Sequence, residues 1–133
     1  MTTRVGKLLE DGVANLCSTV RGALNRIMKP LVEDRLVGKL GMNGVPNFAS
    51  YFKMVRVYCD DNILTVYFPR RADFMSSGVH DHGRAEDHAD NEFSKVVSDS
   101  IKELESFLKQ SNVNIEDIDF ESETNSVTIV VRN

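Results

Sequence analysis

The chain has 133 residues, of which 41% are hydrophobic and 27% are charged, and its formal net charge is −4. This length predicts one domain, residues 1–133, with one hydrophobic core, and the composition excludes wholesale disorder. Charged side chains interrupt the apolar positions of the first 30 residues. We therefore expect neither a secretory signal nor a spanning helix there, because a span needs about 20 predominantly apolar residues.

The charge is divided unevenly along the chain. Residues 1–56 carry nine Lys or Arg and four Asp or Glu (+5), whereas residues 72–133 carry five and fourteen (−9). The basic half could dock an anionic partner, pack against the acidic half of the same chain, or join copies head to tail. The sequence leaves all three interpretations open.

Residues 3–40 form the predicted N-terminal helical segment. Apolar residues recur there at three- and four-residue steps, which predicts a long amphipathic helix over residues 3–29. Pro30 ends or kinks this helix and suits the first turn of a second one. The stripe is longer than a small sheet needs to cover, so it is the candidate interface. Its residues are Leu9, Val13, Leu16, Val20 and Leu24.

Cys17 lies in the same stripe, so its predicted state is a buried free thiol. Together with Cys59 it makes neither a disulfide framework nor a paired metal motif. We therefore expect a reducing, intracellular and cytoplasmic setting without membrane contact. For a viral protein, that setting would be the host cytoplasm or the virion.

Glycines and a proline between residues 38 and 48 predict a hinge, which we place at residues 41–50. Residues 52–70 alternate apolar and polar on either side of an acidic turn, which predicts a β-hairpin with one buried face. The inward positions are Val55, Val57, Leu64, Val66 and Phe68. Residues 72–88 form a polar stretch that we interpret as an exposed loop.

A second helix is predicted over residues 88–110, because apolar residues recur on one face and acidic residues cluster in its first turn. Residues 115–132 then repeat the hairpin pattern. The inward positions there are Ile118, Phe120, Val127, Ile129 and Val131. The elements together predict an α+β fold of order α-β-β-α-β-β, with a four-stranded, largely antiparallel sheet and helices on one face.

The two predicted hairpins align with each other 63 positions apart. Only Asn62/Asn125 and Thr65/Thr128 are identical across the aligned fourteen residues, and the rest is shared patterning. Any two antiparallel hairpins show such patterning, so both coincidence and duplication stay open.

All three histidines, His80, His82 and His88, lie within nine residues. Imidazoles two apart can converge on a metal from an extended segment, and a neighbouring carboxylate could complete the ligand shell. The spacing matches no established motif, and it lacks the two histidines four apart that zinc proteases place on a helix. We favour a solvated polar loop, and we expect no cofactor and no catalytic residue.

The outward face of the first hairpin is a candidate nucleic-acid surface. Its residues are Arg56, Tyr58 and Tyr67, with Arg70 and Arg71 at the edge. Aromatic rings beside guanidinium groups on a sheet can stack bases and neutralise phosphates. The same residue types are good strand formers and common in protein interfaces. Because the acidic half opposes nucleic acid, this interpretation is the alternative.

The favoured function is a non-enzymatic interaction or assembly protein, acting as a homo-oligomer or as a subunit of a larger complex. The amphipathic stripe and the divided charge both require contact, and no catalytic constellation is visible. The alternatives are a small nucleic-acid-binding protein and a metal-dependent enzyme that uses the histidine loop. The helix, strand, turn and strand predicted over residues 88–132 resemble small structural proteins of contractile phage tails and baseplates. That resemblance implies a virion component as one setting.

Overall fold

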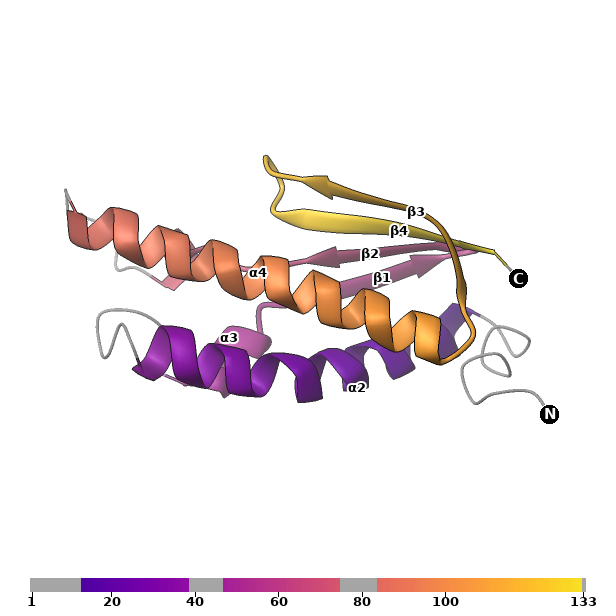
Figure 1. Cartoon of the computed structure of the whole chain (residues 1–133), viewed down its shortest axis with the longest axis horizontal. Helices are drawn as coiled ribbons and strands as arrows, with labels where there is room; N and C mark the ends of the chain where they lie inside the picture. The colour runs from indigo at the N-terminus through magenta and orange to yellow at the C-terminus, as the bar shows by residue number, and fades with distance from the viewer. Residues whose placement is uncertain (1–12, 39–46, 75–83, 133) are drawn as a thin grey trace.

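The computed structural model describes residues 13–38, 47–74 and 84–132. It has two layers, a four-stranded sheet and helices that cover one of its faces (Figure 1). The elements in chain order are α2 (Val13–Val32), the π-helical turn η1 (Glu33–Gly38), α3 (Phe48–Phe52), β1 (Arg56–Asp60), β2 (Ile63–Tyr67), the 3-10 turn η3 (Arg71–Phe74), α4 (Arg84–Gln110), β3 (Asn114–Glu121) and β4 (Ser126–Arg132). The predicted α+β fold is confirmed.

The sheet is antiparallel, with strand order β1-β2-β4-β3. The two hairpins therefore meet through their second strands, while β1 and β3 form the edges. Each hairpin turn contains a non-glycine residue with a positive φ, Asp61 at 51° and Asn125 at 52°. Asp and Asn tolerate this left-handed conformation better than other side chains, which explains their place at the turns.

An approximate twofold rotation relates the two hairpins through the cross-strand pair Thr65–Thr128. Hydrogen bonds at the two ends of the β2–β4 pair follow the same symmetry. An amide of β4 donates to the carbonyl oxygen of Asn62 at 2.8 Å, and the amide just after β2 donates to that of Asn125 at 2.9 Å. The residues that are identical in the sequence alignment thus occupy equivalent places.

In β1 and β3, the residues that the rotation makes equivalent differ by two positions from those that the sequence alignment pairs. The reason is that the second turn is two residues longer than the first. Cys59 of β1 lies opposite Leu64 of β2. The rotation carries Leu64 onto Val127 of β4, which lies opposite Phe120 of β3. Cys59 and Phe120 are therefore equivalent, and both face the helices because an even shift preserves the face.

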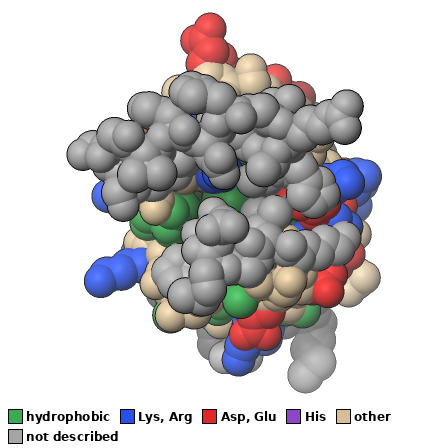
Figure 2. Space-filling model, turned by 90° about the vertical axis from the view of Figure 1, so that its left-hand side faces the viewer, with side chains coloured by type: hydrophobic (Ala, Val, Ile, Leu, Met, Phe, Trp, Pro, Cys, Tyr) green, Lys and Arg blue, Asp and Glu red, His purple; other side chains and the backbone are tan. Residues whose placement is uncertain are grey.

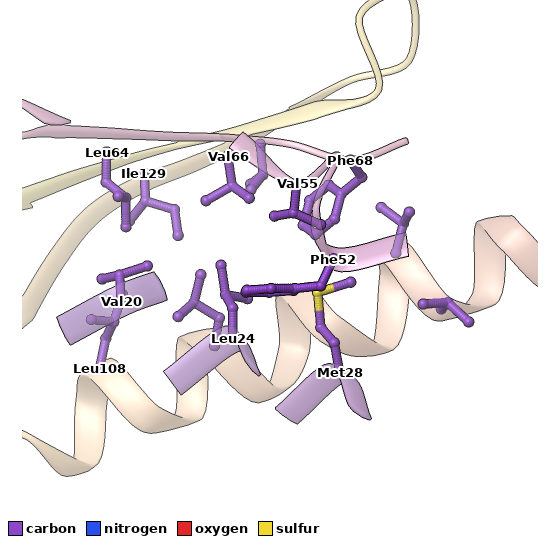
Figure 3. Close-up of a cluster of buried hydrophobic side chains, with 14 of the residues drawn as sticks. Val20, Leu24, Met28, Phe52, Val55, Leu64, Val66, Phe68, Leu108 and Ile129 are labelled. Carbon is purple, nitrogen blue, oxygen red and sulfur yellow. The ribbon is translucent and has the colours of Figure 1, made fainter. Parts of the chain in front are cut away.

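The hydrophobic core lies between the sheet and the two long helices (Figure 3). Its labelled members are Val20, Leu24, Met28, Phe52, Val55, Leu64, Val66, Phe68, Leu108 and Ile129. Full burial of such a side chain contributes about 1.5–3 kcal/mol, so this layer supplies the main stabilisation of the fold.

The inward positions predicted for the first hairpin are confirmed, since all are buried except the half-buried Val57. In the second hairpin the prediction is confirmed for the three positions of β4, which are buried, and for the half-buried Ile118. It is only partly right for Phe120. This side chain lies on the helix side of β3 but is 46% exposed and does not belong to the core cluster.

The predicted interface stripe on α2 is wrong for the three residues whose side chains the structure describes. Leu16, Val20 and Leu24 are at most 1% exposed and belong to the core of the chain itself. The sheet needs the apolar stripes of both long helices to cover its inner face, so none of these side chains is left for a partner. Leu9 and the side chain of Val13 lie outside the described residues.

Pro30 does not end the helix, which was one of the two predicted outcomes, because α2 runs through it to Val32 and continues as η1. A proline inside a helix costs about 3 kcal/mol. Continuing the helix buries Val32 and Leu36 completely, which offsets that cost. A π-helical turn is one of the known responses to an interrupted helical hydrogen-bond ladder.

The last residues of the predicted hinge at residues 41–50 are helical. Its last residues begin α3, which Asn47 caps by accepting a hydrogen bond from the Ser50 amide at 2.8 Å. The short helix buries Tyr51 and Phe52 against the core. The rest of the hinge, residues 39–46, lies outside the described residues.

The prediction of a free thiol at Cys17 is wrong, because a disulfide joins Cys17 in α2 to Cys59 in β1. Their Cα atoms are 5.8 Å apart, inside the usual range for a disulfide. The disulfide alone does not decide the compartment, so the expected reducing setting stays a prediction. Within the described ranges, no helix is long and apolar enough to cross a membrane.

Candidate functional site

The structure divides the candidate nucleic-acid residues between two places. Arg56, Tyr58 and Tyr67 lie on the outer face of the sheet, opposite the helices. The two tyrosines are cross-strand neighbours, with ring centroids 5.6 Å apart in an edge-to-face arrangement. Tyr58 is 52% exposed and Tyr67 37% exposed, so this part of the prediction is placed as expected.

The two remaining arginines do not belong to that surface. The Arg70 guanidinium donates hydrogen bonds to the carbonyl oxygens of Ser122, at 2.6 Å, and of Glu123. Arg71 is buried, with 6% exposure. After β2 the chain runs beside the turn of the second hairpin, and both side chains therefore lie away from the tyrosines. Of the five predicted residues, Arg56 is the one cation that stays beside them.

The outer face is acidic at its opposite edge. Asp117, Asp119 and Glu121 of β3 are exposed, and their cross-strand partners in β4 place them on the side that faces away from the helices. We call these three residues the acidic row. A phosphate backbone that lay across this face would meet the acidic row, which disfavours nucleic acid there.

A cavity lies on the helix side of the sheet. A cavity of about 750 Å³ separates the first part of α4 from the second hairpin and the segment after β2. Its apolar lining among the described residues is Phe93, Val97 and Ile101 from α4, Phe120 from β3 and Ala72 from η3. Polar and charged groups complete it: Arg70, Arg71, Asp90, Ser94, Ser98, Lys102, Ser122 and Asn125. We call this the α4–β3 cavity.

The α4–β3 cavity combines apolar and charged chemistry at one end of the molecule. The view of that end shows hydrophobic, basic and acidic side chains next to one another (Figure 2). Its volume falls within the range of about 300–1,000 Å³ that is usual for binding sites. Apolar walls with a few polar groups are also the usual lining of such sites.

Hydrogen bonds hold the hairpin wall of the cavity in place. The Asn125 side-chain amide donates to the carbonyl oxygens of Phe68, at 3.0 Å, and of Pro69, at 3.3 Å. Together with the Arg70 contacts, these bonds tie the turn of the second hairpin to the end of the first. The hairpin wall of the opening is therefore fixed by the folded structure.

An aromatic cluster holds the α4 wall. Tyr51 of α3 stacks on Phe74 with ring centroids 6.0 Å apart, and Phe93 lies within 6.2 Å of both rings. Burial raises the pKa of the Tyr51 hydroxyl, which has no hydrogen-bond partner among the described residues. The cluster fixes Phe93 between the core and the cavity.

The two helix-hairpin units differ at one equivalent position, and in the second unit that position lies beside the cavity. Cys59 is half-buried and bonded to α2. Its equivalent, Phe120, is not bonded to α4 and projects into the opening. Sequence reasoning missed this site, because alternation assigns Phe120 to the inner face but says nothing of how far α4 reaches along the strand.

The basic and acidic halves of the chain are joined by ion pairs within the chain itself. Arg35 of η1 forms ion pairs with Asp99 at 3.1 Å and with the buried Glu92 at 3.5 Å, both on α4. A basic residue of the N-terminal half therefore packs against the acidic half of the same chain, which was one of the three open interpretations.

The metal prediction for the histidine loop is not tested by the described residues. His80 and His82 lie outside them, and the structure describes the backbone of His88 in α4 but not its side chain. Among the residues that are described, no three His, Cys, Asp or Glu side chains gather in a way that could hold a metal ion.

Comparisons of the chain with protein-family models, with curated proteins and with solved structures found no match.

Proposed function

We propose that this chain is a non-enzymatic interaction module that binds a protein partner at the α4–β3 cavity, as a homo-oligomer or within a larger complex. The observation that carries the proposal is the preformed 750 Å³ opening with the half-exposed Phe120 on its wall. The described side chains of the α2 stripe, Leu16, Val20 and Leu24, are buried in the core, which favours the cavity over that helix as the contact surface.

The chemistry of the cavity supports binding more than catalysis. Ser94, Ser98, Ser122, Asp90 and Lys102 carry nucleophilic or acid–base groups, but no hydrogen bond or ion pair joins any two of these described residues into a catalytic pair. Aromatic side chains at the centre of a pocket with a polar rim are the usual anchors of protein interfaces. A tail or baseplate of a contractile phage is one setting in which a module of this kind would work.

Site-specific photo-cross-linking tests the proposal. The photoreactive residue p-benzoylphenylalanine replaces Phe120 in one variant and Tyr58, on the opposite face of the sheet, in a second. In the cells that make the protein, we expect position 120 to yield a discrete cross-linked protein, either another chain or a second copy. Cross-links from position 58 alone, or from neither position, would contradict the proposal.

A second substitution separates specific from incidental capture. Ser98→Trp puts bulk into the α4–β3 cavity, whereas Ser106→Trp adds the same bulk to an exposed position of α4 that does not line it. We expect the first change to abolish the cross-link from position 120 and the second to leave it. Equal cross-linking in both would mean that the cavity is not the contact surface.

A further inference from the structure

Strand β3 is an edge of the sheet that pairs on one side only. Seven of its eight residues pair with residues of β4, Glu116 lies at a register shift, and no strand of the described residues lies along its other side. In Figure 1 it forms the upper margin of the sheet. An edge of this length presents backbone N–H and C=O groups that can pair with another extended chain.

The two faces of β3 have opposite chemistry. The acidic row lies on the outer face. On the helix side, Ile118 is half-buried and Phe120 lies on the wall of the α4–β3 cavity. A chain that paired with β3 would therefore meet carboxylates on one face and an apolar opening on the other.

The α4 side of the cavity would receive the side chains of such a chain. Val97 and Ile101 face the opening, with Ser94 and Ser98 beside them. An added strand would lie about 4.8 Å from β3, and its alternate side chains would point to the same side as Phe120. Those side chains would fill the space between the sheet and α4.

We propose that β3 binds an extended segment of a partner protein in which apolar and basic residues alternate. The inference rests on the proposed function and names the partner's chemistry. Backbone hydrogen bonds to β3 supply affinity, apolar side chains occupy the α4–β3 cavity, and Lys or Arg side chains pair with the acidic row across the strands.

The acidic row also selects against other occupants. A second copy of β3 would place like charges opposite one another across the new strand pair, which is destabilising. The register irregularity between Ile115 and Asp117 interrupts regular pairing near the start of the strand. Pairing is therefore centred on Asp117–Glu121, the part of β3 beside the cavity.

Labelled synthetic peptides test this inference by fluorescence anisotropy. The probe is an extended peptide of about eight alternating Val and Lys residues, a usual strand length. Three peptides serve as comparisons: one of the same composition in paired order (Val-Val-Lys-Lys), one of alternating Val and Glu, and one with N-methyl groups along one edge of the Val-Lys strand. We expect the Val-Lys peptide to bind and each comparison to bind at least tenfold more weakly, a difference of about 1.4 kcal/mol.

Charge reversal on β3 should invert this preference. The variant Asp117→Lys/Asp119→Lys changes two exposed side chains of the acidic row. Glu33→Lys/Glu103→Lys is the matched control, with two exposed acids away from β3. We expect the first variant to prefer the Val-Glu peptide and the control to keep the Val-Lys preference. Thermal melts confirm that both variants fold.

The outcomes separate this inference from the proposed function. Equal binding of the paired-order or N-methylated peptide, or no inversion by charge reversal, would overturn strand addition to β3. No peptide binding, together with a cross-link from position 120, would also overturn it but would leave the proposed function standing. A concentration-dependent dimer that the β3 charge reversal disrupts would assign the edge to a second copy and overturn the choice of partner.

Discussion

The two helix-hairpin units of this molecule share one plan and use it differently. In the first unit, α2 covers the hairpin and the disulfide Cys17–Cys59 fastens the helix to β1. In the second unit, buried residues of α4 and β4 share the same core, but Phe120, the equivalent of Cys59, lies beside an open cavity. The same pattern of apolar and polar residues can thus close a core in one unit and leave an open cavity in the other.

The difference depends on one position in each edge strand. At Cys59, the disulfide to Cys17 holds α2 against β1. At the equivalent position, the aromatic side chain of Phe120 lines the α4–β3 cavity. The hydrogen bonds of Asn125 and Arg70 hold the second hairpin in place. Changes in the first unit should therefore lower stability, whereas changes at Phe120 should lower binding.

The largest expected effect is the loss of the disulfide. Cys17→Ser/Cys59→Ser, or reduction of the wild type, opens a covalent loop with a sequence separation of 42. We expect the free energy of unfolding to fall by about 2–4 kcal/mol, because the unfolded chain gains conformational freedom. Urea unfolding of the oxidised, reduced and double-serine forms measures this. A loss below about 1 kcal/mol would mean that packing alone holds α2 on β1.

The next effect concerns the attachment of the second hairpin. Asn125→Ala removes the two side-chain hydrogen bonds to the end of the first hairpin and puts alanine at a φ of 52°. We expect a loss of about 2 kcal/mol in the free energy of unfolding. Asn125→Gly is the control, because glycine adopts positive φ without strain, so it should cost less. An equal loss in both would assign the effect to the hydrogen bonds alone.

A smaller effect on stability is expected at Phe120. Because its side chain is 46% exposed, Phe120→Ser should change the free energy of unfolding by less than about 1 kcal/mol. The same change should abolish binding of the Val-Lys peptide. Leu104→Ala, in the buried part of α4, is the contrasting variant, with an expected loss of about 2–5 kcal/mol. A loss of that size at Phe120 would show that it belongs to the closed core.

The smallest expected effect is that of Tyr51→Phe. The Tyr51 hydroxyl is buried, and no described group accepts or donates a hydrogen bond to it. Its removal should leave the stability unchanged or raise it by up to about 1 kcal/mol, because a buried unpaired hydroxyl costs desolvation. A clear loss of stability on urea unfolding would instead reveal a partner for this group.

Nucleic acid provides a separate test of the outer face of the sheet. Of the three arginines predicted for this face, only Arg56 lies beside the two tyrosines, and the acidic row occupies the opposite edge. We expect single-stranded RNA and DNA to bind weakly or not at all in titrations at physiological salt. Tight binding that is lost in Tyr58→Ala/Tyr67→Ala would promote the nucleic-acid alternative, because each lost stack costs about 1–3 kcal/mol.

The elements of the fold could be predicted because their signals are local. Alternation marked both hairpins, and three- and four-residue steps marked both long helices. The features that matter for function depend on contacts between distant residues. Cys17 meets Cys59 across a separation of 42 in the sequence. Arg70 likewise reaches the second hairpin across more than 50 positions. No local pattern reports either contact.

The same limit explains the misplaced interface. The stripe on α2 was recognised correctly as apolar, but a single sequence does not show which surface covers it. The packing of the helices on the sheet makes Leu16, Val20 and Leu24 core residues and leaves Phe120 exposed. The sequence predicts a face for each residue, whereas its exposure depends on the packed structure.

Amide hydrogen exchange with and without the Val-Lys peptide tests most directly the claim that the second unit is the binding side. A strand that pairs with β3 must protect amides of that edge from exchange. The account predicts slower exchange in Asn114–Glu121 and in the part of α4 that lines the cavity, with β1 unchanged. Slower exchange in Arg56–Asp60 with none in β3 would contradict it, because the closed unit would then be the one that binds.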